Sequence, residues 1–382
     1  MRILLASTGS GSRGGGEIFL DYLGQGLADR GHEILMWIPA HLRMNELAER
    51  CARFSRIIRA DYRNTYDYPA RSLATYFNQG VSHRIAREWD DLRPDIVHLN
   101  KQNLEDGLDL LRSAGSCATP AVCTIHLTQT ARQLRAQLAT LRDWIARGAL
   151  RQYQGPLVVV QEARRAALNE FLGGSAQTQT IFNGVPLVER PHLNHVRQAK
   201  RRELGLKDGD FLVVGLGRLV EQKRPFVFLE TARKLHENFP ATKFLWVGDG
   251  QLLPEWKKWI AREKLESVIS CAGWQTDATP FLLAGDLLLH VAVQEGLPFA
   301  IIEAMAAELP CAVMRSLAGE IALFNESNVL FADDPSRLAA RLQIPSELSA
   351  TAARGRQLIE NQFSLRSMVE SYEKLYQSVQ HS

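Results

Sequence analysis

Short apolar runs alternate with longer amphipathic stretches along most of the chain. The apolar runs are rich in Val, Ile and Leu, which is typical of strands that are buried on both faces of a sheet. In the first half we predict strands at 2–6, 34–38, 96–99, 121–125, 157–160 and 180–182, and helices at 17–29, 72–92 and 130–152. Strands and helices that alternate at this spacing form a parallel sheet with helices on both faces.

A polar stretch at residues 183–209 interrupts the alternation, and we interpret it as a linker. Beyond it we predict strands at 211–216, 243–247, 268–269, 287–290 and 310–314, and helices at 225–237, 253–264 and 299–307. The expected fold is therefore α/β, with two Rossmann-like, doubly wound domains, 1–186 and 187–363, that face each other across a cleft. Apolar residues recur at helical spacing after residue 364, which predicts a C-terminal helix, about 364–382, that crosses back to the first domain.

Composition and charge narrow the class of protein. The 382 residues suffice for two domains, and 46% hydrophobic with 23% charged residues is typical of a soluble globular protein. A formal net charge of +3 is too small to indicate nucleic acid as a partner. The five cysteines form no Cys-x-x-Cys pair, so we expect reduced thiols. The apolar start favours a strand over a signal peptide, and residues 281–293 are too few to span a bilayer, so we expect a cytoplasmic protein.

Two glutamates surround a Gly-x-Pro turn in the last third of the chain: Glu295 precedes it, and Glu303 follows eight positions later. Pro298 suits the first turn of a helix, because it has no N–H to leave unsatisfied there. Backbone N–H groups between the glutamates would lie at the positive end of that helix and attract a phosphate. Hydroxyl-accepting carboxylates around an anion site indicate a sugar joined to a diphosphate. A core helix with two solvated glutamates is the alternative.

A glycine-rich loop, residues 9–16, follows the first strand and has the spacing of the dinucleotide-binding fingerprint. That fingerprint also needs an acidic residue after the second strand to hold the ribose, and residues 35–45 contain none, which disfavours a dehydrogenase. The last residues of the loop are the ones that indicate a binding site. Gly15 and Gly16 allow backbone N–H groups to approach an anion closely, and Glu17 suits a first helical turn. A merely flexible loop is the alternative.

Two cations, Arg218 and Lys223, follow the first strand of the second domain. Arginine offers a planar fork to phosphate oxygens, and lysine offers a mobile point charge. A diphosphate leaving group gains negative charge as its glycosidic bond breaks, and two fixed cations can stabilise that charge without a metal. We therefore expect neither a metal nor a bound cofactor. A basic surface pair is the alternative.

Several polar residues and glycines lie where predicted strands end, the edge at which open α/β sheets bind ligands. His126 ends the strand 121–125 and can donate or accept a hydrogen bond to a sugar hydroxyl near neutral pH. The other candidates at strand ends are Asn100 and Lys101 on the acceptor side, Gly248 and Gly250 in a turn placed for a nucleoside, and Trp274, which would flank a base. A structural histidine and a core tryptophan are the alternatives.

The predicted helix at 130–152 carries five arginines against one acidic residue, Asp143. Leucines and Trp144 are expected on another face of it. Such a helix would rest on an anionic membrane or hold a charged acceptor. A surface helix that only covers the sheet is the alternative.

Together these motifs resemble those of glycosyltransferase family four, retaining enzymes of the GT-B fold, over essentially the whole chain. The matching segments are Glu295 and Glu303 for the E-x7-E motif, Arg218 and Lys223 for the Arg/Lys pair, 14–17 for the early glycine loop, 183–185 for N-G-V and 247–250 for V-G-x-G. The family's helix usually continues A-x-G-x-P, and Glu308 stands here in place of that glycine.

The resemblance implies a role for each matching residue. Glu303 should bind the nucleotide ribose, and Glu295 should contact hydroxyls of the donor sugar. Arg218 and Lys223 should hold the diphosphate, and His126 should lie near the donor sugar. The backbone around Pro298, Phe299 and Ala300 should support the sugar and the phosphates.

The resemblance also implies a reaction. A hexose-type sugar would move from a nucleotide-diphosphate sugar, with a UDP-sugar as the default, to a hydroxyl of a glycan or lipid-linked acceptor. The transfer would be retaining and independent of metal, and its place would be the synthesis of lipopolysaccharide or another envelope glycan.

Other classes use some of the same residues. A glycoside hydrolase also has two carboxylates, but Glu295 and Glu303 lie at one helix mouth rather than on both sides of a bond. A sugar phosphorylase on the same fold would reveal itself by phosphate-dependent cleavage of a disaccharide. An inactive carbohydrate-binding scaffold would bind no nucleotide-sugar donor.

Overall fold

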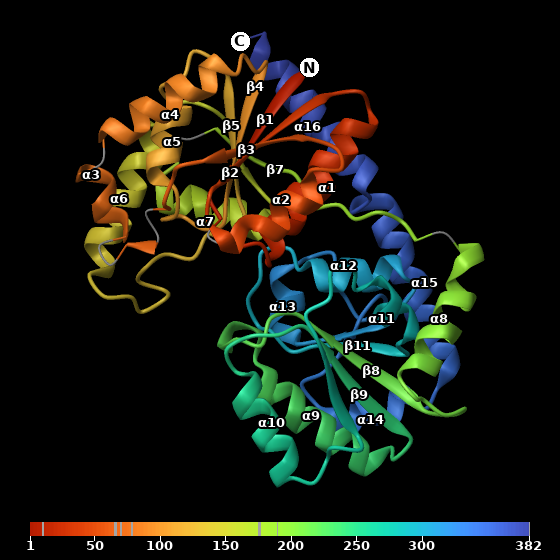
Figure 1. Ribbon diagram of the computed structural model, residues 1–382. Helices are drawn as coiled ribbons and strands as arrows, with labels where there is room; N and C mark the ends of the chain where they lie inside the picture. Colours follow the sequence, from red (N-terminus) through yellow and green to blue (C-terminus); the bar gives the residue numbers. More distant parts are fainter. Residues whose placement is uncertain are drawn as a thin grey trace. The chain divides into compact units, whose positions relative to one another are not determined.

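The computed structural model describes residues 1–9, 11–64, 67–68, 71–77, 79–174, 177–188 and 190–381. Its contacts divide the chain into two compact units (Figure 1). The first unit is Met1–Gly184 with Leu365–Ser382, and the second is Val185–Ser364. The units thus meet after residues 184 and 364, whereas the predicted boundaries lie after residues 186 and 363. Each unit is an α/β unit with a parallel sheet, so the predicted fold class is confirmed.

The first unit is built on a parallel sheet in the strand order β3-β2-β1-β4-β5-β6-β7. Its strands are β1 (Arg2–Ser7), β2 (Glu33–Pro39), β3 (Arg56–Ala60), β4 (Ile96–Lys101), β5 (Ala121–Ile125), β6 (Leu157–Val159) and β7 (Thr178–Thr180). Its helices are α1 (Gly15–Asp29), α2 (Asn45–Cys51), α3 (Ala74–Phe77), α4 (Gln79–Asp91), α5 (Leu108–Ala114), α6 (Ala139–Gln152), α7 (Glu162–Leu172) and α16 (Leu365–Gln380).

The C-terminal helix α16 belongs to the first unit, as predicted, and packs beside α1 (Figure 1). A buried chain of hydrogen bonds ties it to the sheet. The Tyr376 hydroxyl lies 2.6 Å from His98 Nδ1, and the other ring nitrogen of His98 lies 2.8 Å from the Thr124 hydroxyl. Thr124 also bonds the hydroxyl of Tyr372 at 2.9 Å. These polar contacts fix the position of the helix on the sheet, because a buried polar group left without a partner is costly.

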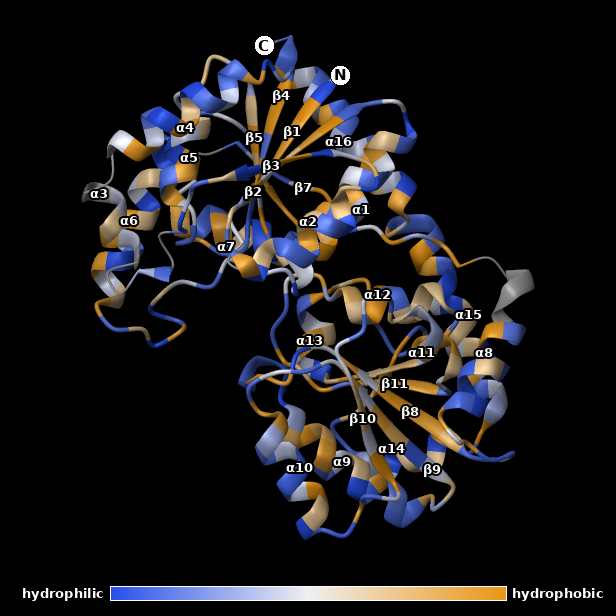
Figure 2. Cartoon of the chain, viewed as in Figure 1, coloured by the Kyte–Doolittle hydropathy of each residue, from blue (hydrophilic) through white to orange (hydrophobic). Residues whose placement is uncertain are grey.

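The second unit repeats the plan with the strand order β10-β9-β8-β11-β12-β13. Its strands are β8 (Phe211–Leu216), β9 (Thr242–Val247), β10 (Ile269–Gly273), β11 (Leu287–His290), β12 (Cys311–Val313) and β13 (Leu330–Phe331). Its helices are α8 (Arg190–Glu203), α9 (Pro225–Asn238), α10 (Leu253–Arg262), α11 (Thr279–Ala284), α12 (Phe299–Ala306), α13 (Arg315–Glu320), α14 (Pro335–Leu342) and α15 (Pro345–Gln362). The strands β1, β8 and β11 are hydrophobic along most of their length, as Figure 2 shows, and their side chains contribute to the two cores.

Two predicted elements are wrong. The helix expected at 130–152 begins only at Ala139, because Arg135 and Leu138 both have φ of 52° and so break a right-handed helix. Residues 130–138 form turns instead, and the Asp143 carboxylate accepts the N–H groups of Ala131 and Arg132 at 2.6 and 3.2 Å. The linker expected at 183–209 contains the helix α8.

Candidate active site

In each of the two sheets, the strand order changes direction at one place. The predicted site residues follow strands that flank that place. In the second sheet the reversal lies between β8 and β11. Arg218 and Lys223 follow β8, and Glu295 follows β11. In the first sheet the reversal lies between β1 and β4, where the glycine loop and Asn100 are found. Ligands of open α/β sheets bind at such points, at the carboxyl ends of the strands.

Lys223 and Glu295 meet across the reversal of the second sheet. The Lys223 ammonium contacts Glu295 Oε1 in a short ion pair, and His290 Nε2 lies 3.6 Å from the same oxygen. Glu295 and His290 are 8% and 4% exposed. Burial by itself raises the pKa of Glu295, but the charge of Lys223 and the contact with His290 outweigh it and lower that pKa to about 2. The site therefore holds a buried carboxylate that is ionised at neutral pH.

Gly217 provides the space for Lys223. Its φ is 144°, in the region that favours glycine, and a Cβ added to it would lie 3.4 Å from Lys223 Cε. The Gly217 carbonyl accepts the indole N–H of Trp246 at 2.9 Å, which fixes this turn on β9. The lysine stem thus lies along the backbone at the end of β8. This arrangement aims the ammonium toward Glu295.

The turn after β9 is locked to the turn after β8. The N–H of Leu219 donates to Asp249 O at 2.8 Å, and the N–H of Gly248 donates to Gly273 O at 2.8 Å. A Cβ added to Gly248 would clash with the carbonyl of Gly217, and one added to Gly250 would clash with the carbonyl of Leu219. The packing of backbone against backbone therefore accounts for both glycines, and their contact with a donor stays a prediction.

Three further candidates of the second unit lie close to these turns or to Glu295 in sequence. Trp274 follows Gly273 directly and is half-buried. Arg218 is exposed, and it takes part in no ion pair within the described part of the chain. Glu303 is half-buried and lies within α12. Their contact with a donor stays a prediction.

The start of α12 lies next to Glu295 in the chain. Pro298 has an extended conformation and is the N-cap, rather than a residue of the first turn as predicted. The first bonds of the helix run from the N–H groups of Ile301 and Ile302 to Pro298 O, at 3.1 and 3.3 Å. The N–H groups of Phe299 and Ala300 therefore precede the helical ladder, in the position that attracts anions.

His126 has less freedom than the sequence indicated. Its Nε2 donates to Asn100 Oδ1 at 2.7 Å, and the Asn100 amide donates to Gly16 O at 3.1 Å. Burial lowers the pKa of His126 to about 4, although Asp106 opposes this. The imidazole is therefore neutral near pH 7 and joins the glycine loop to the ends of β4 and β5.

The structure corrects the expectation for Lys101 and shows a structural role for two glycines of the loop. Lys101 is fully buried and lies 3.5 Å from Asp106, so direct contact with an acceptor is contradicted. In the loop, Cβ atoms added to Gly9 and Gly14 would lie 2.6 and 2.5 Å from the two carboxylate oxygens of Glu17. The glycines thus make room for the chain's own carboxylate. Contact of Gly15 and Gly16 with a donor stays a prediction.

The first unit exposes an apolar surface around the start of α6. It consists of Leu134, Leu138, Leu141 and Trp144, which are 51%, 66%, 42% and 63% exposed, and we call it the Leu134–Trp144 surface. The exposed residues Arg132 and Arg135 lie beside it in sequence. Arg142, one of the five arginines of the predicted helix at 130–152, is buried in a bidentate ion pair with Glu105 at 2.6 and 2.8 Å.

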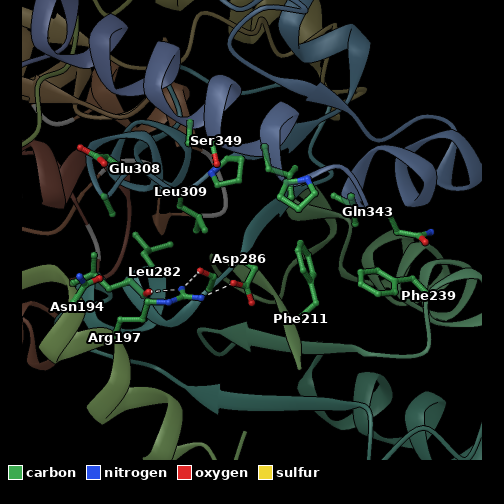
Figure 3. Close-up of a pocket in the computed structure, with 18 residues that line it drawn as sticks. Asn194, Arg197, Phe211, Phe239, Leu282, Asp286, Glu308, Leu309, Gln343 and Ser349 are labelled. Carbon is green, nitrogen blue, oxygen red and sulfur yellow. Dashed lines mark hydrogen bonds and ion pairs between the residues drawn. The ribbon is translucent and has the colours of Figure 1, made fainter. Parts of the chain in front are cut away.

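A pocket of about 670 Å³ lies at the opposite edge of the second sheet (Figure 3). Phe211 at the start of β8 lines it, and Asp286, also in its wall, precedes β11. Asp286 pairs with Arg197 at 2.5 Å and with Arg201 at 2.9 Å. None of the predicted site residues lines this pocket. The pocket therefore lies apart from Lys223 and Glu295, which follow the carboxyl ends of β8 and β11.

Sequence reasoning missed His290 and Gly217. His290 is the only polar residue of β11, and the rule that selected His126 at a strand end would also have selected it. Gly217 had no signal of its own besides its place before Arg218. Within the described ranges, no three His, Cys, Asp or Glu side chains gather in a way that could hold a metal ion. No helix there is long and apolar enough to cross a membrane.

Comparison with known proteins gives matches over both units. Residues 13–189 match the family model Glycosyltransferase Family 4, and residues 210–344 match the model Glycosyl transferases group 1. The chain is 26% identical over 291 residues to the UDP-Gal:alpha-D-GlcNAc-diphosphoundecaprenol alpha-1,3-galactosyltransferase of Escherichia coli, which covers 74% of this chain and 75% of that protein. It is 30% identical over 183 residues to the lipopolysaccharide core biosynthesis glycosyltransferase LpsD of Rhizobium meliloti, covering 46% and 52%.

Among solved structures, Anabaena HepE in complex with UDP-glucose superposes with a TM-score of 0.76. The match covers 99% of this chain and 100% of that one, at 18% sequence identity, and so it shows the fold. The two doubly wound units thus have the GT-B fold, and the matches to the family models show that the chain is a glycosyltransferase. Because the two models together match most of the chain, the protein belongs to glycosyltransferase family four.

Proposed function

We propose that the protein moves a hexose from a UDP-sugar to a hydroxyl of a glycan or lipid-linked acceptor, with retention of anomeric configuration and without a metal. The observation that carries this proposal is the partly buried pair of Lys223 with Glu295, which lies just before the start of α12 in the chain. This region combines three groups that the reaction needs. Lys223 supplies a cation for the diphosphate, Glu295 a carboxylate for the sugar, and the start of α12 backbone N–H groups for the phosphates. The relatives named above support the UDP-sugar and the lipopolysaccharide or envelope-glycan context.

In this proposal each residue has one task. Arg218 and Lys223 stabilise the charge that develops on the departing diphosphate. Glu295 accepts hydrogen bonds from sugar hydroxyls, and Glu303 accepts those of the ribose. The acceptor oxygen attacks on the face that the leaving group vacates, which retains the configuration. His126 is neutral at pH 7, so its part near the donor sugar is a hydrogen bond rather than a charge.

Nucleotide release tests the reaction class. Wild type and Glu303→Ala are incubated with UDP-, GDP-, dTDP- and ADP-sugars in the presence of EDTA. We expect slow release of UDP from one UDP-sugar by the wild type alone. Calorimetry with the same donors separates a missing acceptor from a missing donor site. A Glu303→Ala variant that binds the donor as tightly as the wild type would refute the site assignment.

Two alternatives have specific readouts. A sugar phosphorylase on this fold would cleave a disaccharide only when phosphate is added. An inactive scaffold would bind none of the four nucleotide classes. Once a product is available, the anomeric configuration seen by NMR decides between retention and inversion.

We further propose that the protein works on the inner face of an anionic membrane, which it contacts through the Leu134–Trp144 surface. Leucine and tryptophan side chains enter the headgroup boundary, while Arg132 and Arg135 attract anionic lipid. Sedimentation with phosphatidylglycerol vesicles tests this contact, with phosphatidylcholine vesicles for comparison. We expect Leu138→Ser/Trp144→Ser to lose binding. Leu42→Ser is the matched control, because Leu42 is 83% exposed elsewhere on the same unit. Equal binding by all three proteins would refute the contact.

A further inference from the structure

His290 is a buried histidine next to the proposed reaction site. It ends β11 and is 4% exposed. Its Nε2 has no hydrogen-bond partner within the described residues, and Glu295 Oε1 lies 3.6 Å away from it. This distance is too long for a hydrogen bond, and a movement of less than about 1 Å would close it. A buried ring nitrogen without a partner carries a desolvation penalty, so it is poised to form this bond.

Lys223 competes with His290 for the oxygen that this bond would use. Its ammonium contacts the same oxygen, Glu295 Oε1, that His290 faces. In the proposed function, however, Lys223 must also hold the diphosphate of the donor. A point charge on a flexible stem can move to a new anion, whereas Glu295 must stay in place to bind the sugar. When Lys223 moves to the diphosphate, Glu295 Oε1 loses the Lys223 contact, and His290 Nε2 is placed to replace it.

We propose that His290 is a positioning residue that takes over the Glu295 carboxylate when the donor diphosphate draws Lys223 away. This inference rests on the proposed function. The neutral imidazole with its proton on Nε2 donates to Oε1, and no bond other than hydrogen bonds forms or breaks. The exchange gives Glu295 one orientation in the free protein and another in the donor complex.

The charges around His290 favour this exchange. Burial lowers the pKa of His290, the contact with Glu295 raises it, and the charge of Lys223 lowers it. Departure of Lys223 removes a repulsive charge, so the hydrogen bond from His290 to the carboxylate becomes stronger. Arg224 is a further cation of the loop after β8, and its guanidinium donates to Val291 O at 3.5 Å.

NMR of histidine-labelled protein tests the contact without any donor. The imidazole of His290 is assigned from the signal that His290→Gln loses. We expect a higher apparent pKa for His290 in Lys223→Ala than in the wild type, and a lower one again in Lys223→Ala/Glu295→Gln. If His290 titrates identically in the two variants, it does not contact Glu295, and the inference is wrong.

Calorimetry with UDP and with UDP-galactose tests the role in donor binding. For His290→Leu we expect UDP-galactose to bind about tenfold more weakly, while UDP binds within about twofold of the wild type, because only the sugar contacts Glu295. His290→Gln keeps an N–H donor and should recover most of the loss. Equal losses in both variants would indicate a packing role and overturn the inference. A wild type that binds UDP but no UDP-sugar would instead refute the proposed function.

Discussion

Replacement of Lys223 by methionine should reveal the energetic cost of a buried carboxylate. Glu295 has a pKa of about 2 against 4.5 for a free glutamate, and the difference of about 2.5 pKa values corresponds to about 3 kcal/mol of folding free energy. Burial acts to raise this pKa, and Lys223 supplies the largest of the contributions that lower it. We therefore expect Lys223→Met to lose about 3–5 kcal/mol of stability at pH 7, the range for breaking a buried pair.

The stability difference between wild type and Lys223→Met should depend on pH, in a direction that follows from the lowered pKa of Glu295. A carboxylate whose pKa is lowered by folding stabilises the protein above its unfolded pKa and loses that contribution as the pH falls through its folded pKa. The gap between wild type and Lys223→Met should therefore be largest at pH 7. It should begin to shrink near pH 4.5 and fall to less than about half by pH 3. Other carboxylates affect both proteins equally and cancel in the comparison.

Urea unfolding at pH 7, 5 and 3, followed by tryptophan fluorescence, measures the gap. Arg218→Met is the matched control, because Arg218 is an exposed cation of the same loop, and its loss should cost less than about 0.5 kcal/mol. Lys223→Met/Glu295→Gln should recover most of the stability, since it removes both charges. A gap that is the same at pH 7 and pH 3, or a double variant as unstable as Lys223→Met, would refute the reasoning.

Three other predictions concern the scaffold. Glu308 has φ of 57°, a conformation that costs an L-residue about 1–2 kcal/mol. Glu308→Gly removes this cost but gives the unfolded chain more freedom, so we expect urea unfolding to show a gain in stability of up to about 1 kcal/mol. Glu308→Ala keeps the strain and should gain nothing. Tyr376→Phe removes the hydroxyl partner of His98 and should cost about 1–3 kcal/mol; a loss below 0.5 kcal/mol, roughly the effect of a surface substitution, would contradict this. The pKa of His126 is lowered to about 4, so its contribution to stability should be lost as the pH falls from about 6.5 toward 4, and an NMR titration midpoint near 6.5 would contradict this.

Local pattern sufficed for the strands that carry the site. The predicted strands at 96–99, 121–125 and 211–216 coincide closely with β4, β5 and β8, because continuous apolar runs are buried most readily in the centre of a parallel sheet. Strand-end position then indicated the neighbourhood of Arg218 and Glu295, since parallel strands present their carboxyl ends at one edge. The helix at 130–152 failed because two residues with positive φ carry no sequence signal when they are arginine and leucine.

The sequence by itself determined the parallel sheets, the C-terminal helix on the first unit and the motifs of the family, because these depend on periodicity and on residues close in the chain. Only the tertiary structure decided which groups meet. The pair of Lys223 with Glu295, the approach of His290 to the same oxygen and the full burial of Lys101 all depend on strand order and burial. Charge and hydrogen-bonding power belong to a residue type, but pKa and partner belong to its surroundings, which form only when distant segments fold together.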